Sequence, residues 1–174
     1  MNLSDLRSTG VLAVVRRELR PFFGELRRLY FVYVWGMEIG PRCAISFSAK
    51  LDKSYPRGIH IGEGTAINFG AVVLTHDTPR GVHADTWIGK QCNIGANSMI
   101  MAGVRVGDQC VVAAASVVMK DVPSNCLVAG NPARIMEKGI KTGHRGIIDR
   151  TVRPDFGTPS PVPDETAPPE KAAS

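Results

Sequence analysis

The chain has 174 residues, of which 44% are hydrophobic and 21% are charged, and its formal net charge is +5. This length fits one domain with tails, and no run of about 18 apolar residues predicts a membrane-spanning helix. No basic stripe interleaved with aromatic residues is present, so nucleic acid is not an expected partner. Because the N-terminus lacks the pattern of a secretion signal, we expect a cytoplasmic location.

Residues 1–40 carry apolar residues at helical spacing with arginines between them, and Pro21 is expected to end or kink a first helix. Two interpretations remain open. The segment can be a helical cap that covers the open end of the repeat that follows. It can also be a membrane-interface segment, with arginines at the lipid headgroups and aromatic residues such as Trp35 inserted. The two roles can coexist, and the second predicts peripheral contact with the inner face of the membrane.

Between residues 41 and 125 an aliphatic residue returns at every sixth position, with a few interruptions. A period of six fits neither a helix nor a flat strand, and it is typical of a solenoid in which three units form a coil of about 18 residues. The sequence therefore predicts an all-β solenoid with coils at 61–78, 88–105 and 106–123 and an inserted loop at 79–87. Its inner column is predicted to consist of Ile61, Ile67, Val73, Ile88, Ile94, Ile100, Val106, Val112 and Val118.

The four cysteines, Cys43, Cys92, Cys110 and Cys126, form no C-x-x-C pair, which argues against a zinc site. Cys92 and Cys110 are 18 residues apart, so we expect them to lie one above the other in adjacent coils. The main interpretation is that they are reduced, buried thiols that act as small apolar side chains. A stacked disulfide is the alternative and would need an oxidising compartment.

Residues 126–142 are expected to leave the solenoid, and residues 143–174 form a Pro-rich tail that we expect to be largely disordered. Two stretches accompany the repeat: Leu74-Thr75-His76-Asp77, where the repeat breaks, and a closing segment. The closing segment contains Lys120-Asp121-Val122-Pro123 and then Ala129-Gly130-Asn131-Pro132-Ala133-Arg134.

The repeat and these two stretches together resemble the hexapeptide-repeat O-acetyltransferases, in the branch that includes the maltose, galactoside and polysaccharide acetyltransferases. The resemblance implies a left-handed parallel β-helix as the catalytic domain (41–125), followed by an exit strand and a short C-terminal helix at 133–139. It also implies a homotrimer with clefts between the subunits. The acyl donor would be acetyl-CoA, and no metal is expected.

His76 is the predicted catalytic residue, because it lies where the repeat ends and beside the inserted loop. An exposed imidazole there can act as a general base near neutral pH. It would take the proton of an acceptor hydroxyl, whose oxygen then attacks the thioester of acetyl-CoA without an acyl-enzyme. In the family that this chain resembles, the histidine at this position is that base.

The remaining site residues are predicted by position. By the resemblance to this family, the residues expected to contact acetyl-CoA are Ala96, Ala114, Met119, Lys120 and Arg134. The acceptor would be a sugar or a glycan intermediate of polysaccharide biosynthesis, although the asparagine that binds sugars in related enzymes has no counterpart near residues 45–48. Candidate acceptor contacts are Ser46, Ser48, Asp52, Asp77 and His83.

Two other functions are alternatives to acetyl transfer. A γ-carbonic-anhydrase-like zinc enzyme shares the solenoid, but His60, His76 and His83 lack the spacing of its three ligands, and His60 is expected to point into solvent. A non-catalytic scaffold is the other alternative. The presence of His76, Lys120 and Arg134 argues against it.

Overall fold

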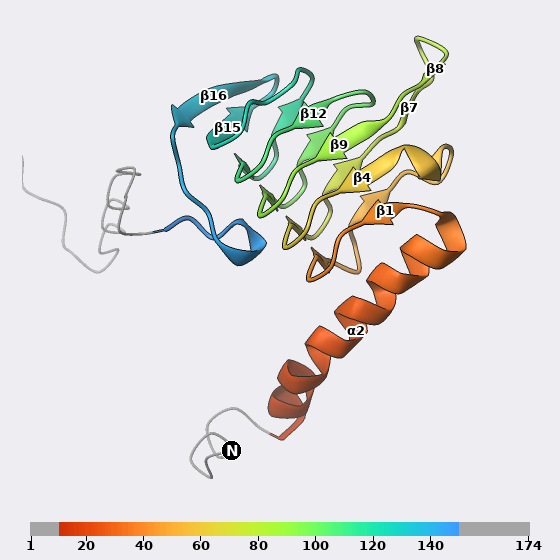
Figure 1. Ribbon diagram of the computed structural model, residues 1–174, viewed down its shortest axis with the longest axis vertical. Coiled ribbons are helices and arrows are strands. Elements are labelled where there is room, and N and C mark those ends of the chain that lie inside the picture. The colour runs from red at the N-terminus through yellow and green to blue at the C-terminus, as the bar shows by residue number, and fades with distance from the viewer. Residues whose placement is uncertain (1–10, 150–174) are drawn as a thin grey trace, which may run out of the picture.

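The computed structural model describes residues 11–149, with side chains from Phe22 onward. A long helix, α2 (Val11–Trp35), precedes a stack of short strands (Figure 1). The helix runs through Pro21, so the prediction that a first helix ends there was wrong. A proline removes one backbone hydrogen bond of a helix, but it does not prevent helical turns on both sides.

The C-terminal half of α2 packs on the first coil of the stack. Phe31 is buried, and Val32 and Trp35 lie against the core. Arg28 fixes the helix by donating a hydrogen bond from Nη1 to the carbonyl oxygen of Ile39, at 2.9 Å. No helix within residues 11–149 combines the length and the apolar character that crossing a bilayer requires.

The strands of the stack form three sheets, which are parallel except for the last strand of the second. The first sheet contains β1 (Glu38–Ile39), β4 (Ile59–Ile61), β9 (Thr86–Ile88) and β12 (Arg105–Val106). The second begins with β2 (Ala44–Ile45), β5 (Ala66–Ile67), β10 (Asn93–Ile94) and β13 (Val111–Val112), and ends with β15 (Cys126–Gly130) and β16 (Ala133–Lys138). The third contains β3 (Lys50–Leu51), β6 (Val72–Val73), β11 (Met99–Ile100) and β14 (Val117–Val118).

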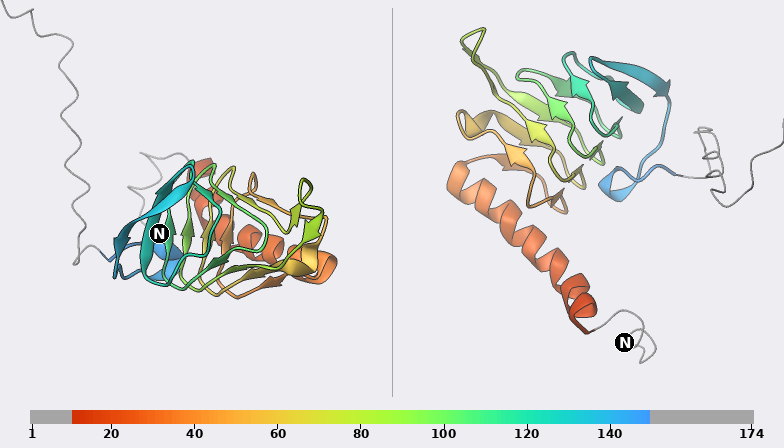
Figure 2. Two further views of the ribbon diagram at one scale, coloured as in Figure 1. Left: turned by 90° about the horizontal axis from the view of Figure 1, so that it is seen from above. Right: turned by 180° about the vertical axis from the view of Figure 1, so that it is seen from behind.

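The chain visits the first, second and third sheet in turn, so it winds into a three-sided stack of coils. Figure 2 shows that α2 meets the first coil, while β15 and β16 close the opposite end. We call the turn between the first and second sheets the first corner, the turn between the second and third sheets the second corner, and the turn back to the first sheet the third corner.

The core is the column of aliphatic side chains inside the stack. All nine inner residues predicted from the period of six are at most 4% exposed. The parallel register superposes them from coil to coil, as in the row Ile67, Ile94 and Val112. The predicted inner column is therefore confirmed. All four cysteines are also buried and free, as expected for reduced thiols.

The irregular segments gather at the third corner. One is a short 3-10 turn, η1 (Pro56–Gly58), and the other is an antiparallel hairpin of β7 (His76–Asp77) and β8 (Val82–His83) that projects from the stack (Figure 1). The sequence predicted an inserted loop at 79–87. Thr86 and Trp87 instead belong to β9, because their backbone continues the ladder between β4 and β12.

The predicted short helix at 133–139 is wrong, because Ala133–Lys138 forms the strand β16. It folds back antiparallel onto β15, the last parallel strand of the second sheet. Without β16, the edge of β15 would present unpaired backbone groups to solvent, which sheets avoid. The residues of this segment do not themselves predict a strand. The strand forms because the edge of β15 needs a partner.

Residues 140–149 return along the first corner as a C-terminal strap, which includes a second short turn, η2 (His144–Gly146). Residues 143–149 were expected to belong to a disordered tail. They are instead tied to the coils, for example by the hydrogen bond from the Arg145 N–H to the carbonyl oxygen of Gly64, at 2.7 Å. The rest of the predicted tail, residues 150–174, lies outside the described residues.

Candidate active site

The third corner brings together Asp52 from the first coil and His76 from the second. Asp52 follows β3 and His76 begins β7, and the parallel pairing of β3 with β6 aligns the two coils. The Nδ1 atom of His76 forms a hydrogen bond to the Asp52 carboxylate. The Asp52 side chain is 3% exposed, whereas that of His76 is 34% exposed. A buried carboxylate therefore supports an imidazole that reaches solvent.

The Asp52 carboxylate is held by further hydrogen bonds from the backbone. Its Oδ2 atom accepts from the N–H groups of Thr75, at 2.9 Å, and His76, at 3.1 Å, and its Oδ1 atom accepts from the N–H of Ser54, at 2.8 Å. Burial opposes ionisation of this carboxyl. The hydrogen bonds from Thr75, Ser54 and His76 outweigh burial and hold the pKa of Asp52 well below its usual range.

This arrangement sets the tautomer of His76. An ionised carboxylate only accepts hydrogen bonds, so Nδ1 of His76 carries the hydrogen that is donated to Asp52. In the neutral ring the Nε2 atom then holds the lone pair. The exposed side of His76 can therefore accept a proton from a bound molecule.

The hairpin β7–β8 brings a second histidine next to His76. His83 pairs with His76 across the hairpin, and their ring centroids are 6.5 Å apart. The ring of Tyr55, from the segment before η1, contacts His83 edge-on at 5.8 Å. His83 thus lies between the rings of Tyr55 and His76 in a series of ring contacts. Sequence reasoning missed Tyr55, because nothing in the repeat indicates which residue of an irregular corner faces the hairpin.

Asp77 and Asp52, two of the candidate acceptor contacts, both have largely buried side chains. Asp77 is largely buried and faces the hairpin turn, where it accepts a hydrogen bond from the Arg80 N–H at 3.3 Å and lies 3.4 Å from the Arg80 Nε atom. Asp52 was also expected to contact the acceptor. It lies beneath His76, and its oxygens accept hydrogen bonds from the backbone and from the imidazole.

Ser46 and Ser48 lie at the second corner, so within one chain the third sheet separates them from His76. Their hydroxyl oxygens are 3.4 Å apart, and Ser48 Oγ also accepts a hydrogen bond from the Gly70 N–H at 3.2 Å. Ser46 lines a cavity of 450 Å³ between α2, the first coil and the strap residues His144 and Arg145. The structure therefore does not bring these serines to His76.

The five residues expected to contact acetyl-CoA lie at two corners of the stack and on β16. Ala96 and Ala114 occupy the second corner in successive coils, whereas Met119 and Lys120 follow β14 at the third corner. Arg134 lies on β16. Lys120 and Arg134 are exposed, and within residues 11–149 neither forms an ion pair. Both cations can accept an anionic ligand.

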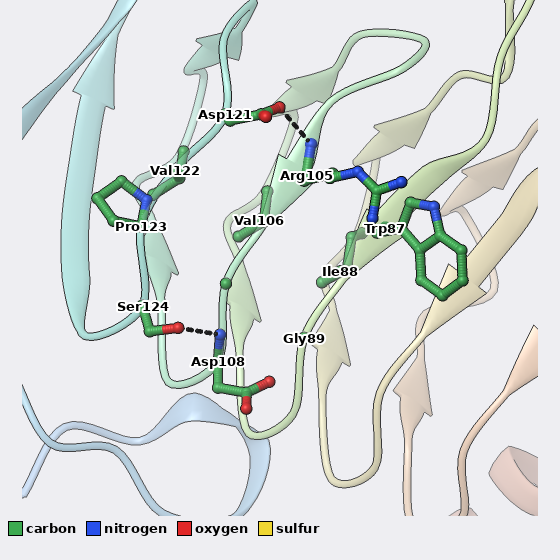
Figure 3. A pocket seen from close by; sticks show the side chains of 11 residues that line it. Trp87, Ile88, Gly89, Arg105, Val106, Asp108, Asp121, Val122, Pro123 and Ser124 are labelled. Carbon is green, nitrogen blue, oxygen red and sulfur yellow. Dashed lines mark hydrogen bonds between the residues drawn. The ribbon is translucent and has the colours of Figure 1, made fainter.

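A column of large polar and aromatic side chains covers the outer face of the first sheet, where the register aligns Glu38, His60, Trp87 and Arg105. His60 does not point into solvent as expected. Its Nδ1 atom lies 2.6 Å from the Glu38 carboxylate, and its ring stacks on Trp87 with 3.7 Å between centroids. A groove of 530 Å³ lies over this face. Figure 3 shows the Arg105 side chain reaching toward Trp87 in it. Neither Asp52 nor His76 lines it.

Within the described part of the chain, no group of three or more histidine, cysteine, aspartate or glutamate side chains is arranged to hold a metal ion. The three histidines weighed as zinc ligands are divided between two places. His60 is stacked on the first sheet, whereas His76 and His83 face each other across the hairpin.

Comparison with known proteins identifies relatives. A family model for the hexapeptide repeat of succinyl-transferases matches residues 86–120. The protein YvoF of Bacillus subtilis, which is provisionally named an acetyltransferase, is 34% identical over 120 residues, which cover 67% of this chain and 68% of that protein. Serine acetyltransferase 2 of Arabidopsis thaliana is 36% identical over 108 residues but matches over only 33% of its own length.

Solved structures agree in fold. A hexapeptide-repeat acetyltransferase of Vibrio cholerae, solved with acetyl-CoA, is 25% identical, with a TM-score of 0.50 over 78% of this chain and 88% of that one. A maltose O-acetyltransferase of Clostridium difficile is 22% identical, with a TM-score of 0.50 over 79% of this chain and 89% of that one, and is similar in fold alone. The six-residue repeat and the match to YvoF over two thirds of both chains lead to one conclusion: the chain belongs to the hexapeptide-repeat acetyltransferase family.

Proposed function

We propose that the protein transfers an acetyl group from acetyl-CoA to a hydroxyl group of a sugar or glycan acceptor, with His76 as the general base. The family supports the acetyl group and its donor, since the Vibrio cholerae relative was solved with acetyl-CoA. The observation that carries the proposal is the Asp52–His76 pair, which leaves one imidazole nitrogen available at the third corner.

The chemistry follows from the tautomer. Nε2 of His76 takes the proton of the acceptor hydroxyl as its oxygen attacks the thioester carbonyl, and the imidazolium then returns the proton to the leaving thiolate. Asp52 stabilises the imidazolium and keeps the ring oriented. Because the hydroxyl attacks directly, no acyl-enzyme forms, and a backbone N–H of a neighbouring coil would stabilise the oxyanion.

The donor would lie along the stack from the second corner to β16. Ala96 and Ala114 are small enough to let the pantetheine arm approach the backbone, with Met119 near the thioester end. Lys120 and Arg134 would pair with the phosphates and the adenosine end, because exposed cations form charge-assisted hydrogen bonds with phosphate.

The family also supports a left-handed winding of the coils and a homotrimer with the donor in a cleft between subunits. Such a cleft would explain why the predicted contacts divide between two corners of one chain. Ser46 and Ser48 would then serve the acceptor bound at a neighbouring subunit, and His83 would line the acceptor side of His76 within the same chain.

The test is His76→Ala, assayed by free-thiol release in a screen of sugar and glycan acceptors. We expect transfer to fall by about 10²- to 10⁴-fold, which is the usual contribution of a general base. Acetyl-CoA binding, measured by calorimetry, should stay unchanged because Lys120 and Arg134 are untouched. Lys141→Ala is the control, since Lys141 is an exposed residue on the strap that does not line the cavity of Ser46 and should affect neither quantity.

Two results would contradict the proposal. If His76→Ala retains transfer, the base has been assigned wrongly. If the wild-type protein does not bind acetyl-CoA at about millimolar concentration, a weak affinity by the usual scale, the scaffold alternative is favoured.

A further inference from the structure

Helix α2 presents two different faces. The face toward the stack is anchored, because Arg28 binds the carbonyl oxygen of Ile39 and Arg27 binds that of Phe47, at 3.1 Å. Phe31 is buried on the same side. These contacts fix the rotation of the helix about its axis, so the residues on the opposite side are held away from the coils.

The opposite side of α2 is apolar and exposed. Six residues there are between 44% and 80% exposed, and we call them the aromatic stripe: Phe22, Phe23, Leu26, Tyr30, Tyr33 and Val34. At about 100° per residue they fall within a sector about 120° wide. From residue 22 to residue 35, the charged residues lie outside this sector, at positions 25, 27 and 28. Glu25 pairs with Arg28, and Arg27 lies over the rings of Phe31 and Phe47.

We propose that the aromatic stripe docks on the surface of an anionic lipid bilayer. The sequence of α2 contains five arginines and two glutamates, so the helix is cationic as well as amphipathic. A helix of this kind lies in the membrane interface with its apolar side chains among the headgroups and acyl chains, and acidic lipids attract it. Tyrosine suits this depth because its ring is apolar and its hydroxyl can reach water, and phenylalanine supplies apolar surface for the acyl chains.

A second copy of the chain is a poorer fit to the stripe. Paired helices bury a narrow seam of mostly aliphatic residues at heptad positions. The stripe is wider than such a seam, and four of its six residues are aromatic. A bilayer surface can accept the whole width, so lipid is the occupant that the composition favours.

Docking would place the third corner next to the membrane. The stripe ends at Val34, and the adjacent Trp35 receives the Lys53 ammonium over its ring at 4.7 Å. Lys53 directly follows Asp52 in the chain. A docked helix would thus hold the Asp52–His76 pair near the lipid surface, where a membrane-bound glycan intermediate would be met. This last step rests on the proposed function, whereas the docking itself does not.

The experiment is flotation of the full-length protein with two kinds of vesicle, phosphatidylcholine alone and phosphatidylcholine mixed with phosphatidylglycerol. We expect wild-type protein to float with the anionic vesicles, and less so as salt screens the arginines. The double variant Leu26→Glu/Tyr33→Glu should bind on the order of tenfold more weakly or worse, because it places two carboxylates in the stripe. The matched control is Ile147→Glu, which changes an equally apolar, 64% exposed residue on the strap and should float like the wild type.

Three outcomes would overturn the proposal. The wild type could fail to float with anionic vesicles, or the double variant could float as well as the wild type. The double variant could also change the oligomeric state in light scattering, which would assign the stripe to a second copy. Acetyl-CoA binding, measured on the same preparations, should be equal in all variants. Failure of docking is therefore distinguishable from failure of the proposed function.

Discussion

At the scale of single residues, the buried carboxylate of Asp52 orients the partly exposed imidazole of His76. Asp52 is surrounded by hydrogen-bond donors that favour its charged form, three of which are backbone N–H groups at the third corner. The same carboxylate fixes the tautomer of His76. The residue that orients the base therefore also stabilises the local fold, and its removal should affect both.

Replacing Asp52 separates these two effects. In Asp52→Asn we expect transfer to fall by about 10²- to 10⁴-fold with little change in the KM for acetyl-CoA, because the imidazole loses the carboxylate that orients it.

Since the pKa of Asp52 is lowered in the folded state, the contribution of this carboxylate to stability is present above the usual aspartate pKa of about 3.9 and is lost as the pH falls below it. Urea unfolding should therefore separate wild type from variant near neutral pH, and less so in acid. A pH-independent gap would contradict the ionised carboxylate.

The sequence predicted His76 but not its partner, and the reason is geometric. The pair joins two coils across 24 residues, and both partners lie in irregular corners where the period of six gives no register. His60 was misplaced for a related reason. Its alternation correctly predicted an outward side chain, but only the register with Trp87 reveals the stack that covers it.

At the scale of elements, the first corner explains why each coil can sit so close to the next. A residue with a left-handed backbone turns the chain there in every coil: Arg42, Gly64, Gln91, Gln109 and Asn125. Buried side chains join the coils by donating to the carbonyl of the following coil, as Thr65 does to Gly89 at 2.8 Å and Cys92 to Gly107 at 3.1 Å. The small residues seen in the sequence are thus required by coil spacing.

The glycine at the start of this corner gives a direct test of that spacing. In Gly62→Ala the new Cβ would lie 2.6 Å from the backbone of Gly89 and Lys90, so the coils must separate. We expect the free energy of unfolding to fall by about 1–3 kcal/mol, the usual cost of overpacking. Gly24→Ala is the control, because a Cβ there meets nothing within 4 Å and alanine favours a helix by about 1 kcal/mol. Denaturant unfolding that ranks the two variants in the opposite order would refute close stacking at this corner.

The elements also mark the limit of sequence-based prediction. The inner column was predictable because each coil repeats the same burial. The strand β16 was not, because its conformation is set by the open edge of β15 rather than by its own residues. Periodicity therefore predicts the interior of this fold well and its two ends poorly.

At the scale of the whole molecule, the C-terminal strap ties separate coils into one body. It is bound to Asn125 in the last coil, to Gln109 and Gln91 in the two before it, and to Gly64 in the second. These four residues belong to the left-handed column of the first corner, so the strap runs along the stack and across the coils. A solenoid whose coils otherwise contact only their neighbours thereby gains long-range contacts.

A substitution in the turn η2 can weaken the contact between the strap and the coils without changing a residue of the coils. Gly146 has a φ of +63°, and a Cβ there would lie 2.3 Å from the backbone nitrogen of Asn93, so Gly146→Ala should lift the strap from the third coil. Gly143→Ala is the matched control, because a Cβ at Gly143 meets nothing within 4 Å.

We expect faster amide hydrogen exchange across residues 140–149 in Gly146→Ala only, together with a loss of about 1–3 kcal/mol in unfolding free energy. Exchange in the inner strands should keep its order among the coils, since the aliphatic column is unchanged. If the strap were merely resting on the surface, both glycine variants would exchange like the wild type. If instead the strap nucleated the coils, Gly146→Ala would fail to fold, and the tie would have to be regarded as part of the core.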